Sequence, residues 1–150
     1  MDGAALIAIA VAEALKIDTA TTFDREQFLG KLLNAARTKE LQVKLRTVAA
    51  LLKQGTSDKD VVEELGRSVR ADESVPFALY SFLKYPMRFD ECILCAVCSG
   101  GDRDTLGAMA GSIVGASLGV ESIPDHWKSN LENREYLEKL AQLLLHKRIK

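Results

Sequence analysis

The side chains with the clearest capacity for chemistry lie in one short segment. Residues 100–105 read Gly-Gly-Asp-Arg-Asp-Thr, which places two carboxylates two residues apart and a hydroxyl directly after them. Two carboxylates this close repel each other, and each raises the pKa of the other unless a cation lies between them. Carboxylate and hydroxyl oxygens suit Mg²⁺, Mn²⁺ or Ca²⁺. The segment therefore predicts a divalent metal site made of Asp102, Asp104 and Thr105.

The same segment also has a simpler structural interpretation. Asp104 can cap the helix that follows, Asp102 can close a turn, and Arg103 can offset their charge. Gly100 and Gly101 let the backbone turn sharply, and they would also let a bound ligand approach closely. The residues alone leave both interpretations open.

Three other families that use an Asp-x-Asp motif do not fit the spacing. An EF-hand loop starting at Asp102 needs a bidentate glutamate at its twelfth position, where this chain has Ile113. A phosphatase of the Asp-x-Asp-x-Thr type needs its threonine one residue after Thr105, behind a β-strand that the sequence does not predict. Nucleotide-sugar transferases place the motif in α/β folds, which this sequence does not indicate either.

The three cysteines form a Cys-x-x-Cys-x-x-Cys pattern, a spacing used by iron–sulfur proteins. They are Cys92, Cys95 and Cys98, and the fourth ligand position of the pattern falls on Asp102. Because the thiols alternate with apolar residues on a predicted helix, we favour cysteines packed in the core. An odd number of clustered thiols also favours a reducing compartment, the cytosol or the nucleus, with the mitochondrion left open.

The composition is that of one folded domain without a strong electrostatic field. Of 150 residues, 47% are hydrophobic and 27% charged, which excludes a disordered chain. Twenty basic residues against 21 acidic ones leave a net charge of −1, so no excess charge attracts nucleic acid or an acidic membrane. We expect neither among the direct partners, and we expect a monomer.

Apolar residues recur at helical spacing along the chain, and no segment shows the alternation of a β-strand. The pattern predicts an all-α fold, a compact multi-helix bundle. The expected helices cover residues 4–11, 24–36, 41–55, 57–66, 74–85, 89–98, 106–119 and 132–147.

We expect the first and last helices to differ in how much of their surface is buried. The first is apolar on all sides, so we expect it to be buried, as in a chain that begins partway through a larger domain. The last is amphipathic, and we expect Tyr136, Leu137, Leu140 and Leu144 to face the core.

The helix after the acidic segment has a glycine at every fourth position. These glycines are Gly107, Gly111, Gly115 and Gly119. Each interior glycine costs about 0.5–1 kcal/mol relative to alanine. The expected compensation is a close approach of another backbone or of a ligand, and we interpret the segment as a central helix that packs tightly on its neighbours.

Segment 100–105 and the glycine-rich helix behind it resemble the C-terminal signature of the ADP-ribosylglycohydrolases. That family reads Gly-Gly-Asp-Thr-Asp-Thr before a small-residue helix that ends in Gly-Ala. Residues 73–83, which begin Glu-Ser-Val-Pro, and residues 123–127, Ile-Pro-x-x-Trp, resemble the branch that removes ADP-ribose from serine and degrades poly(ADP-ribose). Residues 3–6 resemble a mid-chain helix of that branch, so the resemblance covers nearly the whole chain.

The resemblance implies an all-helical fold with two Mg²⁺ ions in a cleft, where ADP-ribose is hydrolysed from a protein side chain. It makes Asp102, Asp104 and Thr105 metal ligands and places Gly100 and Gly101 beside the substrate. The implied partners are ADP-ribosylated proteins or poly(ADP-ribose). The catalytic acid or base is not assigned to any residue.

The resemblance also implies that residues 1–150 are the C-terminal part of a single domain, because the family takes its other metal carboxylates from an N-terminal half. Arg103 replaces the threonine that the family has between its two aspartates. With three ligands from this chain, we expect weak metal binding and negligible turnover by residues 1–150 alone. The alternative is a non-catalytic helical binding or scaffolding module with a degenerate site.

Overall fold

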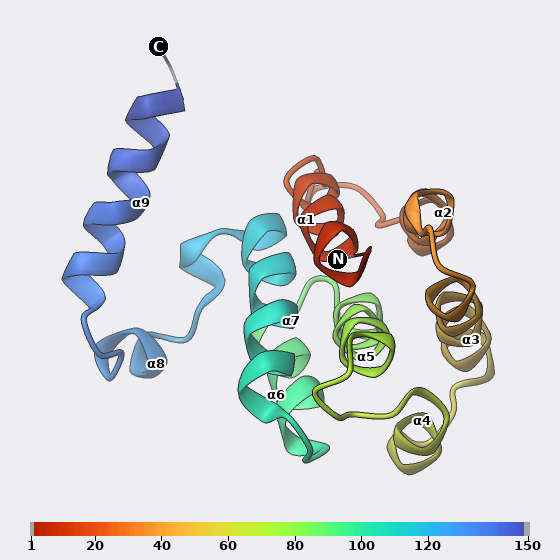
Figure 1. The fold of residues 1–150 in the computed structure, drawn as a ribbon. Helices are drawn as coiled ribbons and strands as arrows, with labels where there is room; N and C mark the ends of the chain where they lie inside the picture. Colours follow the sequence, from red (N-terminus) through yellow and green to blue (C-terminus); the bar gives the residue numbers. More distant parts are fainter. Residues whose placement is uncertain (1, 149–150) are drawn as a thin grey trace.

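The computed structural model describes residues 2–148, and helices are the only regular elements in that range (Figure 1). The expected all-α fold is confirmed. The elements are α1 (Asp2–Ala14), α2 (Arg25–Ala35), α3 (Lys39–Gln54), α4 (Asp58–Leu65), α5 (Ala71–Lys84), α6 (Phe89–Cys98), α7 (Arg103–Leu118), the 3₁₀ helix η1 (Val120–Ser122), α8 (Asp125–Ser129) and α9 (Arg134–Arg148).

Helix α5 forms the centre of the fold. Every residue from 74 to 83 is buried, and the helix packs against α1, α3, α4, α6 and α7. It begins at Ala71, before the start that the sequence suggested at Ser74. The Ser74 N–H donates to the Arg70 carbonyl at 2.8 Å and closes this earlier turn. Pro76 therefore lies inside the helix, where it leaves one carbonyl without its usual N–H partner.

Helix α1 is buried on one face, so the expectation of complete burial is wrong. Gly3, Leu6 and Ala10 are buried against the body, which α1 contacts mainly through α7 and α5. Ala8 and Ala12 on the opposite face are exposed. The sequence of α1 is apolar on every face because it contains many alanines. Each alanine contributes little apolar area, so alanines can also lie on an exposed face.

Helices α6 and α7 pack as an antiparallel pair, with the glycines of α7 at their contact. A Cβ added at Gly107 would lie 2.9 Å from Val97 Cγ1, and one at Gly111 would lie 3.2 Å from Ile93 Cδ1. The expected close approach is therefore confirmed for this ridge. Gly119 does not belong to it: it ends the helix with a φ of 77° and has nothing within 4 Å of its Cβ position.

Helix α9 stands apart from the body of the fold (Figure 1). The expectation that its apolar side chains face the core is wrong, because Tyr136, Leu137, Leu140 and Leu144 are all exposed. Among the described residues, no helix is long and apolar enough to cross a membrane.

We predict opposite effects for two alanine substitutions in α7. Gly107→Ala forces a Cβ against the stiff, β-branched Val97, and such overpacking costs about 1–3 kcal/mol. Gly115→Ala meets Phe89 Cε2 at 3.8 Å, an ordinary contact, and removes the conformational cost of glycine, so it should add about 0.5–1 kcal/mol of stability. Urea denaturation measures both changes. If the two variants have equal free energies of unfolding, α6 moves to accommodate the new Cβ at position 107 without a loss of stability, which would contradict the prediction.

Candidate functional site

Two glycines in left-handed conformations turn the chain between α6 and α7. Gly100 has a φ of 82° and Gly101 a φ of 70°, values that residues with side chains rarely adopt. At Gly101 a Cβ would also collide with the carbonyl oxygen of Arg67. Both the conformation and the available space therefore require glycine, and the turn delivers Asp102 to the start of α7.

The connection between α4 and α5 lies against this turn. The Asp102 backbone N–H donates to the Arg67 carbonyl oxygen at 3.0 Å. The Arg67 side chain covers the start of the turn, with Nη1 3.1 Å from the position that a Cβ of Gly100 would take. One residue of a separate connection thus holds the backbone of the candidate site.

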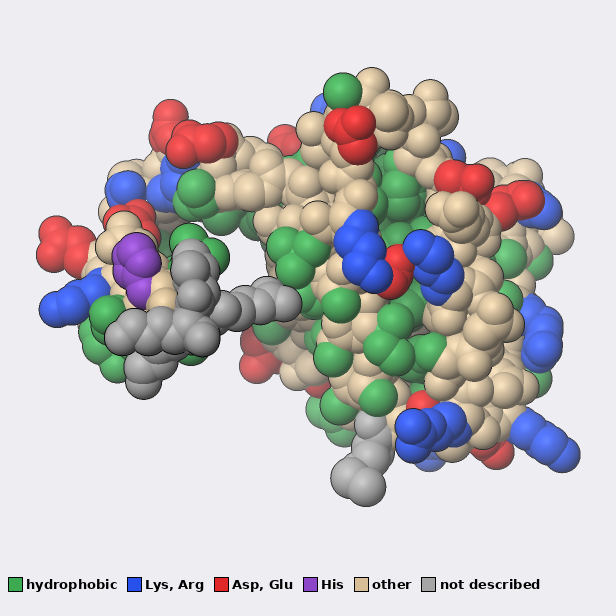
Figure 2. Space-filling model, turned by 90° about the horizontal axis from the view of Figure 1, so that it is seen from above, with side chains coloured by type: hydrophobic (Ala, Val, Ile, Leu, Met, Phe, Trp, Pro, Cys, Tyr) green, Lys and Arg blue, Asp and Glu red, His purple; other side chains and the backbone are tan. Residues whose placement is uncertain are grey.

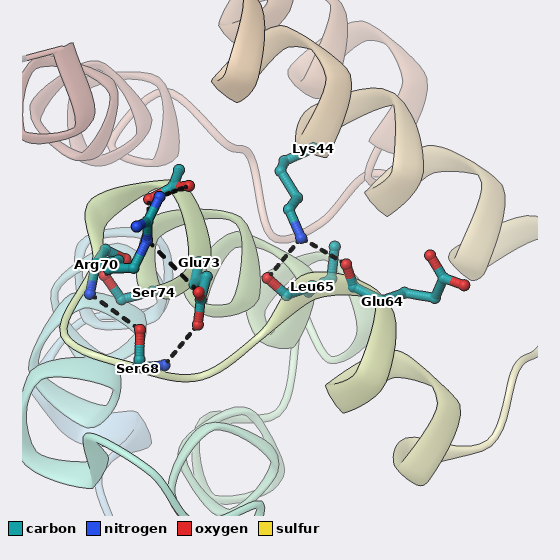
Figure 3. Close-up of polar contacts among 8 residues, drawn as sticks. Lys44, Glu64, Leu65, Ser68, Arg70, Glu73 and Ser74 are labelled. Atoms are coloured by element: carbon teal, nitrogen blue, oxygen red, sulfur yellow. Dashed lines mark hydrogen bonds and ion pairs between the residues drawn. The ribbon is translucent and has the colours of Figure 1, made fainter.

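Glu73, in the first turn of α5, fixes the segment that carries Arg67 (Figure 3). Its Oε2 accepts a hydrogen bond from the Ser68 N–H at 3.1 Å, and its Oε1 lies 3.7 Å from Arg70 Nε. Hydrogen bonds from the Ser68 side chain and backbone are the main cause that lowers the pKa of Glu73, and the charge of Arg70 lowers it further. Gly66 makes room for the carboxylate, because a Cβ there would collide with it.

Lys44 of α3 secures the other end of the same segment. Its Nζ donates to the carbonyl oxygens of Glu64 at 2.6 Å and Leu65 at 3.0 Å, at the C-terminus of α4 (Figure 3). A cation in this position also interacts favourably with the helix dipole. The segment between α4 and α5 is therefore tied at both ends.

Asp102 and Asp104 lie beside each other at the N-terminus of α7. A hydrogen bond with the Asp102 side chain is the main cause that lowers the pKa of Asp104, and the backbone N–H groups of Thr105 and Asp104 add to it. A hydrogen bond between two carboxyl groups needs a shared proton, and a cation between them relieves the same repulsion. Asp102 is half-buried, whereas Asp104 and Thr105 are exposed.

The structure changes one part of the simpler interpretation of these aspartates, the residue at the N-cap. Asp102, not Asp104, occupies the N-cap position of α7, and its side chain makes no capping hydrogen bond. Arg103 is exposed and forms no ion pair with either aspartate within the described residues. Neither carboxylate pairs with Arg103, and Asp104 also accepts hydrogen bonds from the backbone N–H groups of Thr105 and Asp104 at the start of α7.

The oxygen atoms of this loop suit a hard cation but are few. Two carboxylates and a hydroxyl are ligands of the kind that Mg²⁺ takes in its octahedral shell. Among the side chains that the structure describes, no group of three or more from His, Cys, Asp or Glu lies where it could hold a metal ion. The loop therefore fits part of a magnesium site, whose remaining ligands would come from water, from substrate or from another polypeptide segment.

The three cysteines do not share one environment. Cys92 is buried, as expected, and burial raises its pKa to about 12. Cys95 is half-buried and Cys98 exposed, so the expectation of core cysteines is wrong for Cys98. This side of α6 lines a cavity of about 460 Å³ between α4 and α6, which Arg67 also borders. The two candidate metal carboxylates lie outside that cavity.

Sequence reasoning missed the residues that position the loop. Arg67 acts through its backbone carbonyl, and Lys44 acts on the carbonyl oxygens at a helix end, so neither contact depends on a recognisable motif. The sequence did single out the segment that Glu73 begins, Glu-Ser-Val-Pro. It did not indicate the hydrogen-bond partner of Glu73, because Ser68 lies in the connection before α5.

Comparisons with known proteins identify a family and several relatives. The ADP-ribosylglycohydrolase family matches residues 1–150. ADP-ribosylhydrolase ARH3 of Bos taurus is 33% identical over 95% of this chain and 46% of its own length. An uncharacterized protein of Archaeoglobus fulgidus is 37% identical over the same shares. The ADP-ribosyl-[dinitrogen reductase] glycohydrolase of Rhodospirillum rubrum is 48% identical over 29% of this chain. The chain thus spans less than half the length of the first two relatives.

We predict that Gly101→Ala loosens the candidate site. A side chain at this φ costs about 1–2 kcal/mol before the collision with Arg67 is counted. The variant should be less stable in urea, and hydrogen exchange of the Asp102 amide should be faster. Gly30→Ala in α2 is the matched control, because nothing lies within 4 Å of its Cβ position. Unchanged protection of the Asp102 amide would contradict the role of Arg67.

The lowered pKa of Glu73 predicts a loss of stability in acid. Because the folded protein holds this carboxyl at a lower pKa, the unfolded chain binds more protons, and stability falls as the pH drops below about 5. Glu73→Gln removes this carboxyl group. The difference in the free energy of unfolding between the variant and the unaltered protein should therefore shrink as the pH falls from about 7 to about 3. Urea denaturation across this range measures it, with Glu121→Gln as the control. A constant difference would contradict the prediction.

Proposed function

Because this chain belongs to the ADP-ribosylglycohydrolase family, we propose that its acidic loop supplies part of a magnesium-dependent site that hydrolyses ADP-ribose from modified proteins. The observation that carries the proposal is the pair of adjacent aspartates at the start of α7, neither of which forms an ion pair with Arg103. The hydrogen bond to the Arg67 carbonyl supports the proposal, because it holds the backbone of Asp102 in position without an ion.

Every residue of segment 100–105 except Arg103 has a role in this proposal. Asp102, Asp104 and Thr105 would hold Mg²⁺ through carboxylate and hydroxyl oxygens. The bound ion would supply Lewis-acid chemistry, to orient the ribose diol and stabilise charge at the anomeric centre. Gly100 and Gly101 present backbone without side chains, which lets the substrate approach. Glycoside cleavage generally also needs a carboxylate acid or base, a role that we assign to none of the described residues.

The proposed substrates are proteins that carry ADP-ribose on serine, and poly(ADP-ribose). The sequence features that support this choice are Glu-Ser-Val-Pro at the start of residues 73–83 and Ile-Pro-x-x-Trp at 123–127. The bovine and murine relatives are named ADP-ribosylhydrolases, which agrees with the reaction class.

A second candidate function is a helical binding module without catalysis. Two observations favour it: the described residues supply few metal ligands, and an exposed Arg103 stands between the two aspartates. A module of this kind would bind ADP-ribose without a metal ion.

We predict that residues 1–150 bind Mn²⁺, a paramagnetic substitute for Mg²⁺, weakly and through this loop. Asp102→Asn removes a charged ligand and should weaken binding by roughly tenfold or more. Electron paramagnetic resonance of free Mn²⁺ measures the affinity. Glu121→Gln, which removes an exposed carboxylate beyond the other end of α7, should leave it unchanged.

Titration with ADP-ribose in the presence and absence of Mg²⁺ then separates the two candidates. Recognition that requires the metal supports the hydrolase site. Equal affinity for Mn²⁺ in Asp102→Asn and the unaltered protein, together with metal-independent binding of ADP-ribose, would favour the binding module.

A further inference from the structure

The cavity between α4 and α6 contains two thiols that the proposed function does not use. Cys95 and Cys98, one helical turn apart on α6, both line this cavity of about 460 Å³, and Val62 and Leu94 add apolar surface to it. Helices α4 and α6 both pack against the central helix α5 (Figure 1). Sites for small molecules commonly have volumes of about 300–1,000 Å³. The cavity is therefore large enough for a small organic molecule.

The cysteines of α6 differ in their access to solvent and therefore in their reactivity. Cys98 is exposed, Cys95 is half-buried and Cys92 is buried. A thiol reacts with a disulfide as its thiolate, and the reaction requires access to the sulfur atom. Burial raises the pKa of Cys92 to about 12, so this residue supplies little thiolate. Cys98 is therefore the thiol of the cavity that a dissolved reagent reaches most easily.

The lining of the cavity carries two cations that no described carboxylate neutralises. Lys59 of α4 and Arg67 of the connection after α4 both line it, and neither forms an ion pair with a described side chain. Glu63 is the one carboxylate among the lining residues, so the lining has an excess of positive charge. An anion in the cavity would therefore be attracted to it.

A second cavity of the protein shows the opposite arrangement, in which carboxylates neutralise the cations. Lys16 and Lys31 line a cavity of about 230 Å³ between α1 and α2. Their Nζ atoms lie 2.5 Å and 2.6 Å from the two carboxylate oxygens of Glu13. Figure 2 shows an arrangement of this kind, with an acidic group between two basic ones. The cavity that contains Cys98 therefore differs in keeping its cations available to an anionic ligand.

We propose that the cavity between α4 and α6 binds the disulfide of a small anionic thiol compound, and that thiol–disulfide exchange modifies Cys98 there. Lys59 and Arg67 bind the carboxylates of the compound, and the cavity brings its sulfur atoms to Cys98. The Cys98 thiolate attacks one of these sulfur atoms. A bond forms between Cys98 Sγ and that sulfur while the disulfide bond of the compound breaks. The other half leaves as a thiolate, which takes up the proton that Cys98 lost.

The product is a mixed disulfide on α6, and the exchange needs no oxidant besides the bound disulfide. Asp102, Asp104 and Thr105 do not line this cavity. The modification therefore does not depend on metal binding by the acidic loop.

The test compares two disulfides of opposite charge. Glutathione disulfide carries carboxylates and is negatively charged at pH 7, whereas cystamine carries two ammonium groups and no carboxylate. Each is added to the reduced 150-residue chain, and mass spectrometry of the intact and digested protein locates the mixed disulfide. Glutathione disulfide should modify Cys98 first and leave Cys92 unmodified in the folded chain.

The rates are then measured in the Cys95→Ser variant, which leaves Cys98 as the accessible thiol. The rate ratio is defined as the rate with glutathione disulfide divided by the rate with cystamine. Because both reagents react with the same thiolate, this ratio reports the effect of their charge. It should be higher in the folded chain than in urea, where the chain no longer brings Lys59 and Arg67 to Cys98.

Lys59→Gln and Arg67→Gln should each lower the rate ratio by about threefold, because each removes one charge that attracts the carboxylates. Lys139→Gln on α9 is the matched control. It removes the same charge outside the cavity, so the rate ratio should stay unchanged. Cys98→Ser should abolish the modification. Circular dichroism verifies that each variant keeps its helices, which is expected because the altered lysines, Arg67 and Cys98 are exposed.

Reaction of glutathione disulfide at Cys95 while Cys98 stays unmodified overturns the proposal. A rate ratio that is equal in the folded and unfolded chains also overturns it, as does a ratio that neither Lys59→Gln nor Arg67→Gln lowers. In both cases Cys98 would be an exposed thiol without a binding site. The readout is covalent modification, so it stays separate from the Mn²⁺ experiment.

Discussion

The hydrogen bond from the Asp102 N–H to the Arg67 carbonyl joins two connections that are far apart in the sequence, and the candidate site depends on it. Two consecutive glycines with positive φ have a large conformational freedom to lose, so the turn needs external support. Arg67 supplies that support because its own segment is fixed by Glu73 at one end and by Lys44 at the other. The acidic loop thus takes its geometry from α3 and α5.

The same dependence explains why α5 occupies the centre. Its buried residues pack against the helices that flank the loop, and its half-buried first turn provides the carboxylate that holds the neighbouring connection. Helix α7 contributes from the other side, because Gly107 and Gly111 bring it close to α6. The turn between this pair of helices is held by the connection between α4 and α5. A scaffold keeps ligand atoms in a fixed arrangement by such support.

The sequence predicted the features that local patterns encode. Helical spacing gave the helices, and residue types gave Asp102 and Asp104 as a pair, because both depend on nearby residues. The start of α5 was missed because Pro76 suggested a later first turn. Arg67 was missed because a contact through a backbone carbonyl has no side-chain signature. The prediction that the apolar side chains of α9 face the core was wrong. An amphipathic pattern shows that one face of a helix favours contact with another surface, but it does not show which segment provides that surface.

The short ligand set of the acidic loop has a physical explanation in the way helical folds build metal sites. Such sites take ligands from several facing helices, whereas the acidic loop offers the oxygen atoms of a single helix N-terminus. Asp102 is held there by a backbone hydrogen bond, so its position does not depend on a bound ion. Whether the loop acts as a metal site or remains an acidic turn then depends on oxygen ligands from outside the loop, because two carboxylates and a hydroxyl fill only part of an octahedral shell.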